Sequence, residues 1–168
     1  KAEHAHDLEG IMKTFSPDGV MLYNRREFPS DETIRWAHGY IGLTAEAGAW
    51  QDRLGPLVDR RQRDHVHSHV AEALAAGAHA LTGGEVPDGQ GAYYPPTVLI
   101  GCAPQMRVMR EETFGPVAPV RVVPDFDIAL LEAVHDDYGL AATVLTSDMA
   151  HAQAAWRALP VGTVKVNN

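Results

Sequence analysis

The residue types best suited to chemistry lie in residues 111–117, which read EETFGPV. Glu112 and Phe114 are two positions apart, so in an extended backbone their side chains point to the same side. A carboxylate can accept hydrogen bonds from both hydroxyls of a ribose, and a phenylalanine ring can lie flat against an aromatic base. Gly115 and Pro116 predict a sharp turn where another group can approach the backbone closely. The segment therefore suits a nucleotide contact made by Glu112 and Phe114.

The same two residues also have a purely structural interpretation. Glu112 would then be a carboxylate at a strand edge, and Phe114 would be a core side chain, as phenylalanines often are. Residue type and spacing alone favour this structural interpretation. The nucleotide interpretation therefore depends on the sequence that surrounds the pair.

Cys102 is the only cysteine in the sequence, and it directly follows the run VLIG at residues 98–101. A lone cysteine beside an apolar run is usually a small buried hydrophobe. A nucleophilic cysteine would need a base nearby and a lowered thiol pKa, and the neighbouring sequence indicates neither. We therefore predict a structural role for Cys102 and assign no catalytic residue in this chain.

A histidine cluster is the strongest candidate for a metal site. His65 and His69 are four positions apart on an expected helix, and Glu72 follows three positions later. Two histidines at this spacing can share a metal ion, but the same spacing describes a solvent-facing helix side. We favour the solvent-facing side and predict no metal. The glycine-rich residues 83–91 lack the Lys-Ser/Thr ending of a phosphate-binding loop, so we expect a surface loop there.

Helices and strands alternate along the part of the chain that must position these residues. A period of 3.6 begins near Asp59 and places Val66, Val70, Ala73, Leu74 and Gly77 on one helical stripe. We expect strands at residues 80–82, 93–100, 117–123, 141–146 and 161–167, with a helical turn at 105–110. Two further helices are expected, one capped by Asp127 with Ile128, Leu131 and Val134 on one face, and one capped by Asp148 with Met149, Ala152, Trp156 and Leu159. This alternation predicts an α/β fold with an open, mostly parallel sheet flanked by helices.

Composition excludes several classes of function. The 168 residues carry a formal net charge of −8, which argues against a nucleic-acid partner because such partners select clustered Lys and Arg. No apolar run approaches the roughly 20 residues of a membrane-spanning helix. A single cysteine fits a reducing compartment, so we expect the cytoplasm.

Several segments together resemble the aldehyde dehydrogenase family, in which they follow one another in this order. They are LGPLV at residues 54–58, GA at 77–78 with LTGG at 81–84, YPPTVL at 94–99, EETFGPV at 111–117, YGLAA at 138–142 and VGTVKVN at 161–167. The resemblance covers about Asp52 to Asn168. It divides the chain into an N-terminal segment of unclear origin at residues 1–53, expected as helix, turn and helix, and a family-like α/β catalytic-domain portion at residues 54–168.

The resemblance implies a parent activity and a cofactor. That activity is NAD(P)-dependent oxidation of an aldehyde to a carboxylic acid, with Glu112 and Phe114 in the family's nicotinamide-ribose segment and NAD or NADP as cofactor. The family's nucleophile segment and dinucleotide fold lie upstream of LGPL, and residues 1–53 contain no counterpart. We therefore expect a truncated relative that is inactive alone and retains little affinity for the cofactor.

Two hypotheses remain for such a truncated relative. The chain is either part of an enzyme completed by other residues or chains, or a non-catalytic binding or scaffold protein that reuses the fold. We therefore expect a homo-oligomer or a completing chain as partner: a completing chain under the first hypothesis, and under the second a homo-oligomer formed through an exposed sheet edge.

Overall fold

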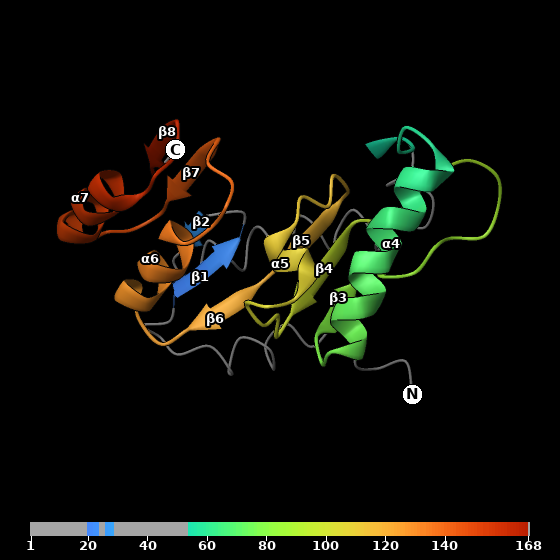
Figure 1. Cartoon of the computed structure of the whole chain (residues 1–168), viewed down its shortest axis with the longest axis horizontal. Helices are drawn as coiled ribbons and strands as arrows, with labels where there is room; N and C mark the ends of the chain where they lie inside the picture. Colours follow the sequence, from blue (N-terminus) through green and yellow to red (C-terminus); the bar gives the residue numbers. More distant parts are fainter. Residues whose placement is uncertain (1–19, 24–25, 29–53, 168) are drawn as a thin grey trace. The chain divides into compact units, whose positions relative to one another are not determined.

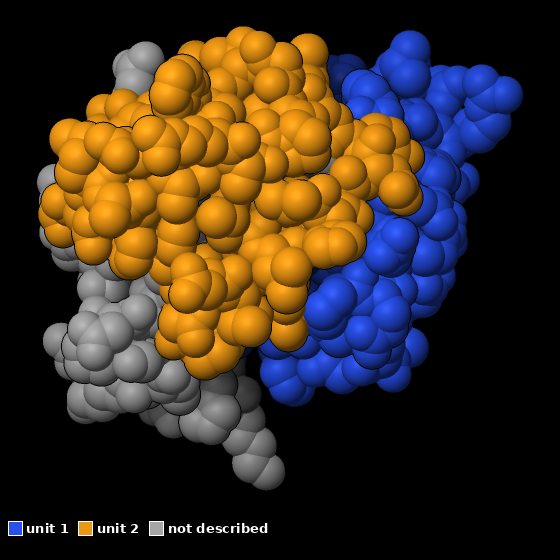
Figure 2. Space-filling model, turned by 60° about the vertical axis from the view of Figure 1, so that its left-hand side comes forward, with its two compact units in different colours: residues 1–6, 36–120 blue, residues 7–35, 121–168 orange. Residues whose placement is uncertain are grey.

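A computed structural model of the protein describes residues 20–23, 26–28 and 54–167 (Figure 1). The chain divides into two units (Figure 2). Of the described residues, 54–120 belong to unit 1, and 20–23, 26–28 and 121–167 belong to unit 2. In this described part of the chain, no helix is both long and apolar enough to cross a membrane.

Unit 1 combines one long helix, one short helix and a three-stranded sheet. In chain order its elements are α4 (Arg60–Ala75), β3 (His79–Thr82), β4 (Thr97–Ile100), α5 (Arg107–Arg110) and β5 (Val117–Pro119). The strand order is β3-β4-β5, in which β4 pairs antiparallel with β3 and parallel with β5. The expected helix, the helical turn and the first two strands are therefore confirmed, with β4 starting only after Pro95 and Pro96.

The helix α4 forms where the apolar period of the sequence predicts it. Asp59 is its N-cap, and the Asp59 carboxylate accepts a hydrogen bond of 2.7 Å from the backbone N–H of Gln62. Val66, Val70 and Ala73 are buried on one face of the helix. Because these three residues belong to the predicted stripe, the predicted packing face is confirmed.

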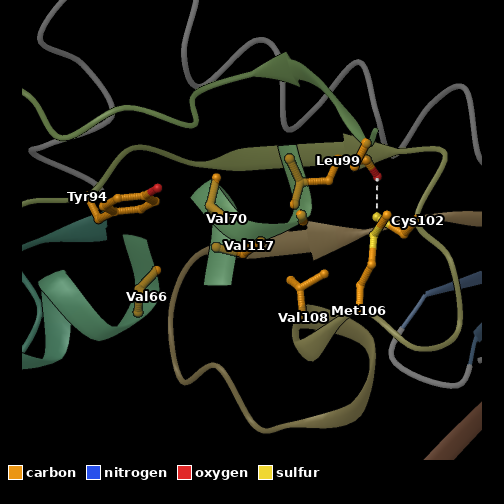
Figure 3. Packing of buried hydrophobic residues seen from close by; sticks show 10 residues of the cluster. Val66, Val70, Tyr94, Leu99, Cys102, Met106, Val108 and Val117 are labelled. Carbon is orange, nitrogen blue, oxygen red and sulfur yellow. Dashed lines mark hydrogen bonds between the residues drawn. The ribbon is translucent and has the colours of Figure 1, made fainter. Parts of the chain in front are cut away.

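The core of unit 1 lies between α4, α5 and the sheet, as Figure 3 shows. Val66 and Val70 of α4 belong to the same buried cluster as Leu99 of β4 and Val117 of β5. Burying four side chains of this size stabilises the unit by several kcal/mol, at about 1.5–3 kcal/mol for each. The helix that supports residues 111–116 is thereby fixed to the sheet.

Unit 2 combines a five-stranded sheet with two helices. Its elements are β1 (Val20–Tyr23), β2 (Arg26–Phe28), β6 (Arg121–Val123), α6 (Phe126–Val134), β7 (Ala141–Val144), α7 (Met149–Ala158) and β8 (Thr163–Val166). The strand order is β6-β1-β2-β7-β8. The pairs β6/β1 and β1/β2 are antiparallel, whereas β2/β7 and β7/β8 are parallel. Ala142, Thr143 and Val144 are all buried, as expected for a strand of which both faces are covered.

The faces of the two helices in unit 2 differ from the predicted ones. Asp125, not Asp127, is the N-cap of α6, because the Asp125 carboxylate accepts from the backbone N–H of Ile128 at 2.9 Å. Leu131 is exposed, and the smaller Ala129 and Ala133 face the core instead. On α7 the Asp148 cap is confirmed.

The predicted packing of Trp156 on α7 is wrong. Its side chain is 65% exposed, whereas Ala152 and Ala155 are buried. The apolar residues of α7 form two overlapping faces, one with Trp156 and one with Ala152 and Ala155. The helical period alone does not tell which of these faces meets the sheet.

The α/β fold class is confirmed, and the strand pairing is more mixed than a mostly parallel sheet. Among the described strands, three pairs are parallel and three are antiparallel. The expected strand at residues 117–123 is split into β5 and β6, which belong to different sheets. Pro119 has no N–H to donate, and Val120 makes the last hydrogen bond to β4, from its N–H to the carbonyl of Leu99 at 2.8 Å.

The N-terminal segment contributes at least two strands to unit 2. The strand β1 pairs with both β2 and β6. The helices expected elsewhere in residues 1–53 lie outside the described residues. The division of the chain at residues 53 and 54 stays a prediction.

Candidate functional site

Residues 111–116 connect α5 to β5, and we call them the contact segment. Glu112 and Phe114 both face solvent, and the Phe114 ring is 74% exposed. Phe114 adopts a φ of 47°, a left-handed conformation that is uncommon for a residue with a side chain. The segment is therefore not the regular extended backbone that the spacing suggested. The exposure of Phe114 also excludes the core-phenylalanine interpretation.

Gln62 of α4 holds the backbone of the contact segment. Its side-chain amide donates to the carbonyl of Thr113 at 3.0 Å and to that of Phe114 at 3.2 Å. These bonds link positions about fifty residues apart in sequence and occupy two backbone acceptors that helix and sheet do not use. The amide of Gln62 therefore stabilises the uncommon conformation of Phe114.

Gly115 allows the contact segment to approach α4 closely. A Cβ atom added at Gly115 would lie 2.5 Å from Cγ2 of Val66. The N–H of Val117 donates to the Gly115 carbonyl at 2.8 Å, which closes a tight turn around Pro116. The predicted turn and the predicted close approach are both confirmed.

His69 of the same helix is fully buried and has a polar partner at each ring nitrogen. Its Nδ1 lies 3.1 Å from Oγ1 of Thr113, and its Nε2 lies 2.9 Å from a terminal nitrogen of Arg107. A guanidinium can only donate, so Nε2 accepts and the neutral ring carries its proton on Nδ1. Burial first, and then the charge of Arg107, lower the pKa of His69, which favours this neutral form. The Nδ1–H therefore donates to Thr113.

Arg107 of α5 connects His69 to two carboxylates. Its guanidinium donates to both oxygens of Glu111, each at 3.1 Å, and to Glu72 at 3.3 Å. These hydrogen bonds from Arg107 hold the pKa of Glu111 below its ordinary value. A Glu111 oxygen also lies 3.4 Å from Nε2 of His69, but that contact is an ion pair only with a protonated ring. We assign Nε2 to the shorter bond from Arg107.

The contact segment thus rests on a single face of α4. Gln62, Val66 and His69 are spaced i, i+4 and i+7, which places them above one another on a helix. Gln62 and His69 hold Thr113, the residue between Glu112 and Phe114, at its carbonyl and at its hydroxyl. Such a support can present a carboxylate and an aromatic ring to a ligand without using either of them for packing.

The buried position of Cys102 agrees with the structural role predicted for it. Cys102 is 1% exposed, and its thiol lies 3.8 Å from the carbonyl of Leu99. Figure 3 marks this contact with a dashed line. Burial raises the pKa of the Cys102 thiol, which disfavours the thiolate that a nucleophile requires. In this environment Cys102 packs like a small apolar residue.

The prediction that the histidine pair faces solvent is wrong for His69. Its ring lies 4.4 Å from that of His65, but His69 is buried and Arg107 occupies its Nε2. Over residues 54–167 and the two described N-terminal strands, no three metal-ligating side chains converge. In the glycine-rich loop, the N–H of Gly84 donates to Oγ1 of Thr97 at 2.9 Å and so is not free for a phosphate.

Sequence reasoning found the exposed pair but missed the residues that support it. Gln62, His69, Thr113 and Arg107 come from three separate parts of the chain. One signal was available, because His69 lies beside Val70 and on the flank of the apolar stripe. A histidine at such a position is polar, so its burial requires a partner that the sequence does not identify.

Comparison with known proteins places the chain among enzymes of one family. The sequence model described as "Aldehyde dehydrogenase family" matches residues 43–168. Over 117 residues the chain is 42% identical to the succinate semialdehyde dehydrogenase [NAD(P)+] Sad of Escherichia coli, covering 70% of this chain and 25% of that protein. It is 39% identical over 138 residues to an aldehyde dehydrogenase of Paenarthrobacter nicotinovorans, covering 79% and 30%.

Solved structures agree with these sequence relationships. A succinate-semialdehyde dehydrogenase from Burkholderia pseudomallei superposes with a TM-score of 0.71 at 35% identity, covering 81% of this chain and 28% of that one. A lactaldehyde dehydrogenase from Escherichia coli superposes with a TM-score of 0.64 at 37% identity, covering 68% and 24%. The chain therefore spans about a quarter of the length of the relatives it matches.

Proposed function

Because the chain belongs to the aldehyde dehydrogenase family, we propose that it contributes Glu112 and Phe114 as a contact for the nicotinamide half of NAD or NADP. The carboxylate of Glu112 would accept hydrogen bonds from the ribose hydroxyls, and the Phe114 ring would lie beside the nicotinamide. The observation that carries this proposal is the exposure of both side chains on a segment held from the α4 side.

The parent reaction is NAD(P)-dependent oxidation of an aldehyde to a carboxylic acid, and we propose it for an enzyme of which this chain is one part. When bound, the nicotinamide ring supplies a hydride acceptor. The exposed carboxylate and ring of this chain would orient that group, and binding of only half a dinucleotide would give low affinity. The E. coli relative named above carries NAD(P)+ in its name, which supports this choice of cofactor class.

We propose that the chain alone does not catalyse the oxidation. The reaction needs a thiolate that attacks the aldehyde carbon, and Cys102, the only cysteine in the sequence, is buried with a raised pKa. The parent activity would then require a completing chain or further residues. A cytoplasmic location fits a single cysteine held as a thiol.

A non-catalytic scaffold is the second candidate, and two observations favour it. Large apolar side chains of unit 2 are exposed, among them Leu140 at 90% and Met149 at 71%. The strand β8 pairs with β7 alone among the described strands, which leaves one edge for another chain. Both features suit a homo-oligomer or a completing chain.

An NMR titration tests the proposed nucleotide contact. In the ¹⁵N-labelled chain, millimolar NAD⁺ or NADH should shift the backbone amide signals of the contact segment, whereas adenosine monophosphate should leave them unchanged. Glu112→Gln and Phe114→Ala should each weaken binding, and Glu85→Gln, an exposed carboxylate in the glycine-rich loop, is the matched control. No shift with either dinucleotide at millimolar concentration would overturn the proposal.

An activity assay tests the second part of the proposal. The purified chain with an aldehyde and NAD⁺ should produce no NADH absorbance above the protein-free control. Turnover by the wild-type chain that disappears in Cys102→Ala would contradict the assignment of Cys102 to the core.

Size-exclusion chromatography with light scattering separates a monomer from the proposed oligomer.

A further inference from the structure

His69 is a buried polar side chain to which the proposed nucleotide contact gives no direct role. It is fully buried in α4, and burying a polar ring is costly unless its nitrogens are hydrogen-bonded. Both nitrogens are bonded, and the two partners lie on different elements, Arg107 on α5 and Thr113 in the contact segment. The ring therefore joins α4, α5 and the contact segment.

The direction of each hydrogen bond follows from the chemistry of the partners. Arg107 can only donate, which makes Nε2 of His69 an acceptor and places the single ring proton on Nδ1. That Nδ1–H points to the hydroxyl oxygen of Thr113, which must accept it. A ring with this fixed tautomer orients the Thr113 side chain toward α4.

Thr113 is the residue between Glu112 and Phe114, so its orientation bears on both neighbours. Its hydroxyl bonds to His69 and its carbonyl bonds to Gln62, and both bonds lead to α4. Glu112 and Phe114 are exposed on either side of it. Releasing the Thr113 side chain would remove one of the two hydrogen bonds that hold this residue, and with it part of the constraint on the carboxylate and the ring.

We propose that His69 is a positioning residue for the nucleotide contact: as the neutral Nδ1–H tautomer it holds Thr113 and thereby sets the presentation of Glu112 and Phe114. This inference rests on the proposed nucleotide contact. His69 itself touches no ligand, because it is fully buried behind the segment. It reaches Thr113 through the hydroxyl of that residue, so replacing the hydroxyl is the direct test.

Two variants of Thr113 separate the hydrogen bond from the shape of the side chain. Thr113→Val keeps the branched shape and removes the acceptor, whereas Thr113→Ser keeps the acceptor. Thr113→Val should weaken NADH binding roughly three- to tenfold, the effect of losing about one hydrogen bond. Thr113→Ser should bind within about twofold of the wild type. Thr143→Val, at a buried threonine of β7 in unit 2, is the matched control and should leave NADH binding unchanged.

A spectroscopic measurement tests the tautomer without any nucleotide. Two-dimensional ¹H–¹⁵N correlation of the histidine rings should show His69 with a protonated Nδ1 and an unprotonated Nε2 at neutral pH. The Nδ1–H signal should exchange slowly with water in the wild type and in Thr113→Ser. In Thr113→Val it should shift and exchange faster, while urea unfolding shows that the variant is folded.

The outcomes separate the two proposals. If the nucleotide shifts no backbone amide signal of the contact segment in the wild type, the proposed nucleotide contact is wrong. The positioning role of His69 is then wrong as well. If the wild type binds NADH and Thr113→Val binds equally well, the nucleotide contact stands and the positioning role is overturned. An Nε2–H tautomer, or a protonated ring at neutral pH, would also overturn the positioning role.

Discussion

At the scale of single residues, the contact segment depends on small and polar side chains that α4 meets directly. Gly115 has room only for a hydrogen atom opposite Val66, and the donors of Gln62 and His69 fit the acceptors of the segment. Each of these contacts is short and specific. Single substitutions should therefore have effects that can be assigned to one atom.

Gly115→Ala should lower the free energy of unfolding by about 1–3 kcal/mol, the usual cost of overpacking. The added methyl group would lie 2.5 Å from Cγ2 of Val66, so α4 or the segment must move. Urea unfolding of Gly115→Ala, Val66→Ala and the double variant measures the coupling. The double variant should be less destabilised than the sum of the two single changes, and strict additivity would show that the two positions do not clash.

The pKa of His69 predicts a pH dependence of stability. Burial and then Arg107 and His65 lower this pKa, against a smaller opposing effect of Glu111 and Glu72. The unfolded chain therefore takes up the proton near pH 6.5 while the folded chain does not. Stability from the neutral ring is complete above about pH 6.5 and declines as the pH falls through the lowered value, by up to about 1.4 kcal/mol per pH unit.

Urea unfolding between pH 5 and 8 checks this pH dependence. In His69→Gln the amide offers a donor and an acceptor but does not titrate, so the decline below pH 6.5 should be shallower than in the wild type. The two proteins differ only at residue 69, so the difference between the two curves is assigned to that side chain. Parallel curves would show that His69 does not titrate as described.

At the scale of elements, α4 is the part of unit 1 that organises the site. Its N-cap Asp59 sets where the helix begins, and its buried stripe fixes which face meets the sheet. The same face of the helix that packs Val66 into the core also aims Gln62 and His69 at the contact segment. Packing and site geometry are therefore decided by one helix orientation.

The two aspartates at the start of α6 offer a test at this scale. Asp125→Ala should lower the free energy of unfolding by about 1 kcal/mol, because the backbone N–H of Ile128 loses its acceptor. Asp127→Ala, in the first turn, should cost only a few tenths of a kcal/mol through the helix dipole. Thermal unfolding of both variants compares them directly. An equal or larger effect at Asp127 would restore it as the cap.

At the scale of the whole molecule, the residues that the structure describes form two buried apolar clusters, one in each unit. One surrounds Leu99 in unit 1, and the other includes Phe126 and Leu159 in unit 2. The strand expected at residues 117–123 serves both units, with β5 in one sheet and β6 in the other. We expect each cluster to control the local stability of its own unit.

A pair of core truncations tests this expectation. Leu99→Ala and Leu159→Ala should each cost about 2–5 kcal/mol, the usual range for a buried leucine. Hydrogen exchange followed by mass spectrometry should show faster exchange in β4 and α4 for the first variant, and in β7 and α7 for the second. Equal acceleration in both units by either variant would mean that the molecule unfolds as one cooperative body.

The sequence by itself determined the fold class, the family and the helix α4 with its buried stripe, and it named Glu112 and Phe114 as candidates, whose exposure the structure then showed. These features depend on period, capping and turn chemistry, which act between neighbours in the chain. The turn at Gly115 and the burial of Cys102 could also be predicted from the sequence. A glycine-proline pair indicates a turn, and a lone cysteine in an apolar run indicates burial, without knowledge of distant residues.

Only the tertiary structure decided how that pair is supported and which strands meet. The bonds from His69 to Thr113 and Arg107 join residues 38 or more positions apart, and no local pattern states which polar groups will be buried together. The same holds for the pairing of β1 with β6, and for Trp156, which the helical period places near the core and packing leaves in solvent. Interactions between neighbours in the sequence decide which segments become helices and strands. Which polar groups are buried together and which strands pair depends on how all the elements pack, and this is decided only in the folded chain.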